Sequence, residues 1–141
     1  MEFDIQKLKT RFAEIREHLE EIKTLARYAD EELFADSRNM AAMKYHLLVI
    51  LEAMGSICVH VCARGLQKAV NEYAECFEFL RDGNIIPAEL SGELIKMVRF
   101  RSLIVHRYWE ADDRKILGYV RTELHTIEDF LKHIGKKTLS E

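Results

Sequence analysis

Between Ile5 and Ile22 the chain reads IQKLKTRFAEIREHLEEI. Its apolar residues recur at intervals of three and four positions, and most residues between them are charged: Ile5, Leu8, Phe12, Ile15, Leu19 and Ile22. This spacing predicts an amphipathic helix with a narrow apolar seam, as in helical bundles. The last part of the chain repeats these intervals at Leu117, Val120, Leu124, Ile127, Leu131 and Ile134. They predict a second such helix, beginning at a cap on Asp112 or Asp113 and ending at Gly135.

Two or three further helices are expected between these segments. Asp36-Ser37 can cap a long helix that stops at Arg64-Gly65. Its run 47–51 is apolar on every side and is therefore expected to be buried all round, against other helices or a second subunit. A shorter helix is expected near residues 71–81. Pro87 suits the first turn of a helix reaching Val105 or His106. The sequence thus predicts an all-α fold, an up-and-down bundle of four to five helices, forming one domain over residues 1–141.

Composition limits the class of function. Hydrophobic residues make up 48% of the 141 residues, which excludes a disordered chain. The net charge of −3 excludes a polycation that coats nucleic acid, although not a local basic site. The longest apolar stretch, residues 47–63, is shorter than the roughly 20 residues of a membrane span. No targeting signal is recognisable, so we expect a cytoplasmic protein that does not contact a membrane.

The sequence indicates no metal site or cofactor. Cys58 and Cys62 share a helical face, but two such residues on a buried helix are most simply small core residues, and three cysteines on apolar stretches suit a reduced protein. Four histidines have no partner at ligand spacing and are expected to be solvated or at the edge of the core: His18, His46, His125 and His133. Glu52, inside an apolar helix, either pairs with an arginine or faces a polar cleft.

A basic island follows. From Lys96 to Lys115 there are six Lys or Arg against three Asp or Glu, a local charge of +3 that leaves −6 for the rest of the chain. Arg101 shares a helical stripe with Leu90, Leu94 and Met97, where a buried side chain is expected. A charge there requires a partner or a cleft. Two interpretations stay open, a core salt bridge with Glu52 as a candidate partner, or an anion site.

Arg101, His106 and Tyr108 resemble the R-x4-H-x-Y signature of the HEPN superfamily, and more narrowly of the HepT-like toxins that are paired with minimal nucleotidyltransferases. The turn 83–87, the run 97–101 and the acidic restart at Asp112-Asp113 extend the resemblance over most of the chain. One position departs from the pattern. Ser102 stands where the family usually has Asn, which puts its supporting role in orienting the catalytic groups in doubt.

The resemblance implies a metal-independent endoribonuclease toxin of a toxin–antitoxin system, acting as a homodimer on an RNA substrate. Arg101 would bind the phosphate and His106 would transfer protons while an RNA 2′-hydroxyl attacks the adjacent phosphate. Five residues along an ideal helix place these two side chains about 140° apart, and one chain has one motif histidine. If two chains meet about a two-fold axis, Arg101 of one chain can lie near His106 of the other, and the cleft contains two motif histidines. The cognate nucleotidyltransferase antitoxin would silence the toxin by adding adenylyl groups to Tyr108.

A second function remains open from the sequence. Ser102 and the acidic net charge favour a non-catalytic subunit that binds nucleotide or RNA, or that regulates a nucleotidyltransferase complex. In that case Arg101 and His106 would bind phosphate without cleaving it. Independently of the function, the alternative to modification of Tyr108 is that this residue, beside Trp109 at a helix end, is an ordinary packing residue with a solvated hydroxyl.

Overall fold

The computed structural model describes residues 2–106 and 112–140, and in this part of the chain the backbone forms seven helices and no strand. They are α1 (Ile5–Ala26), α2 (Asp30–Ala35), α3 (Ser37–Leu66), α4 (Tyr73–Asp82), α5 (Ala88–His106), α6 (Asp113–Thr122) and α7 (His125–Thr138). The all-α prediction is confirmed. There are more helices than the four or five expected, because α2 was not foreseen and the last expected helix is divided into α6 and α7.

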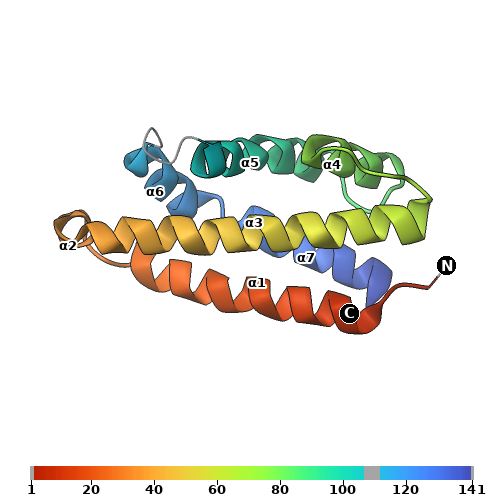
Figure 1. Ribbon diagram of the computed structural model, residues 1–141, viewed down its shortest axis with the longest axis horizontal. Coiled ribbons are helices and arrows are strands. Elements are labelled where there is room, and N and C mark those ends of the chain that lie inside the picture. The colour runs from red at the N-terminus through yellow and green to blue at the C-terminus, as the bar shows by residue number, and fades with distance from the viewer. Residues whose placement is uncertain (1, 107–111, 141) are drawn as a thin grey trace.

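The long helices α1 and α3 lie side by side and form the base of the molecule (Figure 1). The Asp4 side chain caps α1 by accepting a hydrogen bond from the Lys7 amide at 3.0 Å. Five of the six predicted seam residues are buried: Leu8, Phe12, Ile15, Leu19 and Ile22. Ile5, in the first turn, is 40% exposed. The predicted seam therefore faces the core over all but the first turn of the helix.

Helix α3 supplies much of the core. It passes the predicted stop at Gly65 and ends at Leu66, because the chain reverses at Gln67, whose φ of 53° is left-handed. In the run 47–51, Leu47, Ile50 and Leu51 are buried within the chain, whereas Leu48 and Val49 are half-buried, so burial of the remaining surface against a second subunit stays a prediction. By length and composition α3 passes the test for a membrane span, yet 61% of its most apolar window is buried within the molecule, as in the core helix of a bundle.

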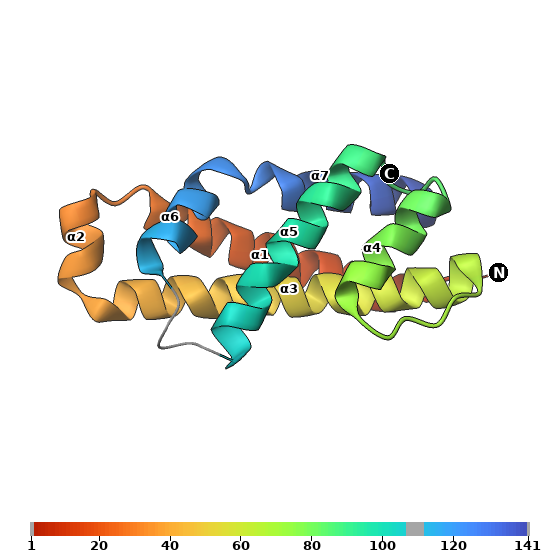
Figure 2. The same cartoon turned by 90° about the horizontal axis from the view of Figure 1, so that it is seen from above.

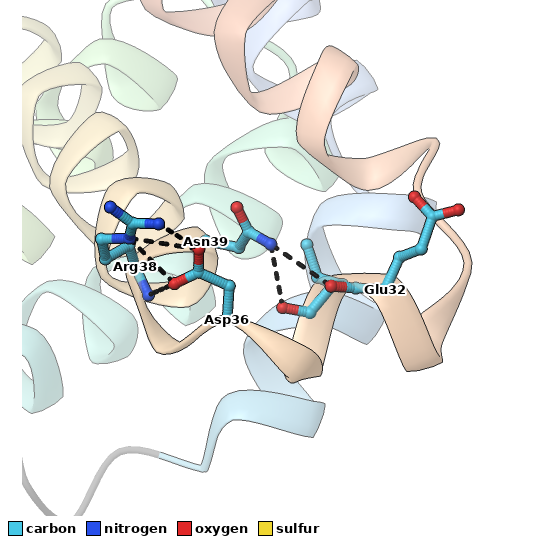
Figure 3. Close-up of polar contacts among 5 residues, drawn as sticks. Glu32, Asp36, Arg38 and Asn39 are labelled. Carbon is cyan, nitrogen blue, oxygen red and sulfur yellow. Dashed lines mark hydrogen bonds and ion pairs between the residues drawn. The ribbon is translucent and has the colours of Figure 1, made fainter.

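The short helix α2 and the start of α3 are joined by polar contacts (Figure 3). Asp36 Oδ1 accepts a hydrogen bond from the Arg38 amide at 3.0 Å, which confirms the predicted cap. The amide nitrogen Nδ2 of Asn39 donates to the backbone oxygens of Glu32 and Leu33 at the end of α2. The guanidinium of Arg38 binds the same Asp36 carboxylate and holds its pKa down at about 2. These bonds position the sharp turn between the two helices.

The prediction of one continuous last helix is wrong, because the chain breaks between α6 and α7 at Glu123 and Leu124. Arg121, near the end of α6, donates hydrogen bonds to the backbone oxygens of Ala26 and Tyr28 and to Asp30 Oδ1. These bonds tie the end of α6 to the connection between α1 and α2. The break nevertheless leaves the predicted seam facing inward, since five of its six residues are buried and Leu124 is half-buried.

Helices α4 and α5 form an upper layer, in which α5 crosses above α3 (Figures 1 and 2). The turn between α4 and α5 is closed by Asn84, with a left-handed φ of 59°, and by the buried residues Ile85 and Ile86. Ser91 Oγ donates to the backbone oxygen of Phe77 at 3.0 Å, which joins α5 to α4. Pro87 directly precedes α5, and the helix continues to His106 as predicted. This arrangement sets the last turns of α5 beside the middle of α3.

Candidate active site

The motif residues lie at the carboxyl end of α5. Arg101 and Ser102 are within its last two turns, and His106 is its last residue. Ser102 is exposed and Arg101 is half-buried. The His106 side chain and the whole of Tyr108 lie outside the described residues. Since α5 keeps its helical backbone through His106, positions 101 and 106 stay about 140° apart around the helix axis, as on an ideal helix.

Arg101 is held by side chains from two other helices. Its Nε donates a hydrogen bond to Oε1 of Glu52, on α3, at 2.7 Å. Its guanidinium lies over the ring of Tyr73, on α4, with Cζ 4.7 Å from the ring centroid. The Tyr73 hydroxyl in turn donates a hydrogen bond to Glu52 Oε2 at 3.0 Å, so each of the three residues contacts the other two. We call Arg101, Glu52 and Tyr73 the arginine triad.

The sequence left open whether Arg101 forms a core salt bridge with Glu52 or belongs to an anion site, and the arginine triad bears on both interpretations. The two residues do form a salt bridge, but it lies at the surface, with 26% of the Arg101 side chain and 45% of the Glu52 side chain exposed. The predicted stripe of Leu90, Leu94 and Met97 is buried as expected. Arg101 comes one turn later, where that stripe leaves the core. Solvent can therefore reach the guanidinium.

Tyr73 is the member of the triad that sequence reasoning missed. Burial raises the pKa of its phenol, and the hydrogen bond to Glu52 raises it further, so the hydroxyl stays protonated as a donor. Nothing in the sequence around position 73 points to Arg101, which lies 28 residues further along the chain. Glu52, by contrast, was detectable because it is a charge in an otherwise apolar helical segment.

A cavity of about 480 Å³ opens beside the triad. Its walls come from α3, from the segment before and at the start of α4, and from α5: Val59, Val70, Asn71, Glu72, Tyr73, Ala74, Val98, Arg101 and Ser102. This volume falls within the range of about 300–1,000 Å³ that is usual for ligand sites, and about half of the lining residues are polar. Arg101 and Ser102 thus contribute to one hollow that can admit a ligand.

The cysteines are arranged differently from the prediction. A disulfide joins Cys58, on α3, to Cys76, on α4, so the interpretation of these residues as reduced thiols is wrong. The pairing could not be read from the sequence, because the two residues are 18 positions apart and meet only once α4 packs on α3. Cys62 is a free, buried thiol, and burial together with Glu75 raises its pKa to about 11.

Two histidine contacts were also missed. His18 and His46, on α1 and α3, approach each other with their Nδ1 atoms 2.8 Å apart, and burial with the neighbouring His18 lowers the pKa of His46. His60 Nε2 accepts a hydrogen bond from the backbone amide of Asp4 at 2.9 Å, at the start of α1. Burial lowers the pKa of His60, as do the nearby cations Lys7 and Arg64. These contacts join α1 to α3 and lie apart from the arginine triad.

Comparison with known proteins supports the resemblance carried by the motif. A family model described as ribonuclease HepT-like matches residues 15–134. No curated protein sequence matches the chain.

Solved structures of similar fold include a tri-AMPylated Shewanella oneidensis HEPN toxin in complex with MNT antitoxin, with 25% identity and a TM-score of 0.82 over 91% of this chain and 96% of that one. A toxin–antitoxin structure with AMP-PNP has 24% identity and a TM-score of 0.82, over 91% of this chain and 97% of that one. A cytosolic protein of unknown function from Bacillus subtilis, YutE, has 17% identity and a TM-score of 0.81, over 95% of this chain and 90% of that one.

Proposed function

Because the chain belongs to the ribonuclease HepT-like family, we propose that it is a metal-independent endoribonuclease toxin, silenced by a nucleotidyltransferase antitoxin. The observation that carries the proposal is the arginine triad, which presents a half-buried guanidinium at a cavity large enough for a ligand. With Nε bound to Glu52, the terminal amino groups of Arg101 carry further N–H donors that can bind phosphate oxygens.

The proposed reaction requires only proton transfer and charge stabilisation. A general base removes the proton of an RNA 2′-hydroxyl, whose oxygen attacks the adjacent phosphorus. The bond from phosphorus to the 5′-oxygen breaks, a general acid protonates that oxygen, and a 2′,3′-cyclic phosphate remains. An imidazole ordinarily gains and loses its proton close to cytosolic pH, and this chemistry suits a histidine at position 106 for these proton transfers. Arg101 stabilises the negative charge that accumulates on the phosphorane. Ser102 lines the same cavity, where its hydroxyl would support the site by hydrogen bonding.

We propose that the working unit is a homodimer. Regular helix through His106 keeps positions 101 and 106 on different sides of α5. One chain also contributes a single motif histidine, whereas the reaction uses both an acid and a base. A two-fold axis beside the end of α5 would place two Arg101 and two His106 around one cleft. The RNA substrate and the nucleotide that modifies the toxin would both be met in the cytoplasm.

Silencing is assigned to Tyr108, two residues beyond the end of α5. The similar Shewanella toxin is described as tri-AMPylated and in complex with MNT antitoxin. In this chain the phenol oxygen of Tyr108 would attack the α-phosphorus of ATP, held by the cognate minimal nucleotidyltransferase, and release pyrophosphate. The added adenylyl groups bring negative charge next to Arg101, where they would compete with RNA phosphate.

A second candidate is a non-catalytic subunit that binds nucleotide or RNA, or that regulates the nucleotidyltransferase. The observation that favours it is the Glu52 carboxylate, which already compensates the charge of Arg101. Ser102, in place of the family's usual Asn, favours it as well.

Growth on expression separates these two functions. We expect the wild-type chain to arrest growth, and Arg101→Ala, His106→Ala or co-expression of the nucleotidyltransferase to relieve the arrest. His125→Ala, an exposed histidine on α7, is the matched control and should remain toxic. Equal growth of cells that express the wild-type and the Arg101→Ala chains at the same level would contradict the toxin function.

A further inference from the structure

Three sulfur atoms meet between α3 and α4. Cys58 and Cys62 are one helical turn apart on α3, and Cys76 faces them from α4. The three Sγ atoms all lie within 4.8 Å of one another. Cys58 and Cys76 are joined, with their Cα atoms 6.1 Å apart, inside the range of ordinary disulfides. The Cys62 sulfur is 3.6 Å from that of Cys76. Cys76 therefore has two possible partners on α3.

The surroundings of this cluster favour sulfur–sulfur chemistry over metal binding. All three residues are 0% exposed. Metal ions bind thiolates, whereas burial and Glu75 keep the Cys62 thiol protonated by raising its pKa to about 11. A disulfide is neutral and tolerates an apolar site. Reagents can reach the sulfurs only when α4 separates locally from α3, so their reactivity reports that opening.

The position of Cys76 connects the cluster to the arginine triad. Tyr73 is the first residue of α4 and lies three positions before Cys76, about one turn away on the same helix. α4 has only 10 residues, so a covalent bond at Cys76 restricts the whole helix. Its first turn carries the ring that lies under Arg101 and the hydroxyl that binds Glu52.

We propose that Cys58, Cys62 and Cys76 form a redox site whose oxidation fixes α4, and with it Tyr73, beside Arg101. In the oxidation step, the Cys58 and Cys76 thiols give two protons and two electrons to a low-molecular-weight disulfide, which becomes two thiols while the protein disulfide forms. In an internal exchange, which takes place when α4 separates locally from α3, the Cys62 thiol first loses its proton and the resulting thiolate attacks the Cys76 sulfur. The bond between Cys62 and Cys76 then forms, the bond between Cys58 and Cys76 breaks, and Cys58 receives the proton that Cys62 loses. Control of RNA cleavage by this site rests on the proposed function, whereas the redox site itself does not.

Thiol counting on the full chain tests the chemistry. The protein is incubated with oxidised glutathione or with a phosphine reductant, then denatured and alkylated with a maleimide, and the adducts are counted by intact mass. We expect one reactive thiol after oxidation and three after reduction. The Cys62→Ser chain should have no reactive thiol after oxidation and two after reduction. Cys58→Ser should still form a disulfide, between Cys62 and Cys76, and Cys76→Ser should form none. Three reactive thiols in the oxidised wild-type chain would overturn the proposal.

Hydrogen exchange tests the coupling to Tyr73 without reference to any activity. Amides of residues 73–82 should exchange at least about tenfold more slowly in the oxidised than in the reduced chain. Residues 125–138, in α7, serve as the internal control and should exchange equally in both states. Equal exchange of residues 73–82 in both states would overturn the coupling. A chain that passes both tests but cleaves no RNA would refute the proposed function and leave the redox site standing.

Discussion

Glu52 binds both other members of the arginine triad, with one carboxylate oxygen on Arg101 and the other on the Tyr73 hydroxyl. A side chain that accepts a hydrogen bond from the Nε of an arginine restrains the plane of the guanidinium. It therefore also sets the direction of the remaining N–H donors. In the proposed function Glu52 is thus a positioning residue, since it would act on the RNA only through Arg101. Because the salt bridge is partly exposed, its contribution to the stability of the fold is small.

Glu52→Ala should consequently lower RNA cleavage by about tenfold while leaving the thermal midpoint of unfolding almost unchanged, because the loss is one of orientation. Glu52→Gln keeps an oxygen that can accept a hydrogen bond from Arg101. Its rate of RNA cleavage should therefore lie between those of the wild-type and Glu52→Ala chains. Initial cleavage rates and melting curves of the three chains test this. Full activity of Glu52→Ala would show that Arg101 needs no orientation by α3.

His60 makes the stability of the fold sensitive to pH. Its Nε2 accepts a hydrogen bond from the Asp4 amide and so must be unprotonated in the folded state. Its pKa is lowered on folding, mainly by burial, and the unfolded chain therefore binds more protons just below neutrality. The stabilisation is complete above the ordinary histidine pKa of about 6.5 and is lost as the pH falls through the lower pKa of the folded state. His46 contributes with the same sign.

The free energy of unfolding should accordingly fall between pH 7.5 and 5.5. In His60→Gln, whose amide oxygen can still accept from Asp4, the decrease should be smaller. Urea denaturation of the wild-type and His60→Gln chains at both pH values measures this decrease in the free energy of unfolding. An identical decrease in the two chains would remove His60 from the explanation.

At the scale of elements, Gly55 determines how closely α4 approaches α3. A methyl group at this position would collide with Cε1 and Cζ of the Tyr73 ring, so glycine is required for the ring to lie against the helix. On an exposed helix, alanine in place of glycine normally stabilises by about 0.5–1 kcal/mol. At Gly55 the sign should reverse, because the ring must move away from Glu52 and Arg101.

Gly55→Ala is therefore expected to lower both the melting temperature and the rate of RNA cleavage. Gly118→Ala is the matched control, since a methyl group on that helical glycine meets nothing within 4 Å and should stabilise the chain slightly without altering cleavage. Differential scanning fluorimetry and an RNA cleavage assay on both variants provide the comparison. A Gly55→Ala chain as stable and active as wild type would show that the Tyr73 ring can lie elsewhere without loss.

Helical elements that depend on local spacing could be predicted from the sequence, whereas features that depend on contacts between distant residues could not. The apolar periodicity was sufficient for α1, for most of α3 and for the inward face of α6 and α7, because burial of one helical face depends on local spacing. The break after Thr122 was not predictable, since it depends on bonds from Arg121 to residues more than 90 positions earlier. The cysteine pairing and the role of Tyr73 were missed for the same reason. Arg101 and Glu52 were detectable as charges at apolar positions.

At the scale of the whole molecule, the proposed active site requires two chains. Arg101→Ala and His106→Ala homodimers would each lack one member of every catalytic pair. If the pair is drawn from opposite chains, a mixed dimer has one intact pair. If one such pair suffices for cleavage, random mixing should restore about a quarter of the wild-type sites, because half of the dimers are mixed and each keeps one site of two. A cleft that needs both arginines and both histidines at once would show no rescue. Cleavage rates of the two variants alone and mixed, with light scattering to measure the assembly, test this. A fully active monomer at assay concentration would contradict the two-chain site.

We propose that this chain cleaves RNA through Arg101 and His106 without a metal ion. The most direct test of this proposal is to incubate purified wild-type, Arg101→Ala and His106→Ala chains with RNA in excess EDTA and to identify the product ends by mass spectrometry. We predict cleavage by the wild-type chain that leaves 2′,3′-cyclic phosphate ends, and loss of cleavage in both variants while each remains folded. Cleavage that requires a divalent cation, or a His106→Ala chain as active as wild type, would contradict the account.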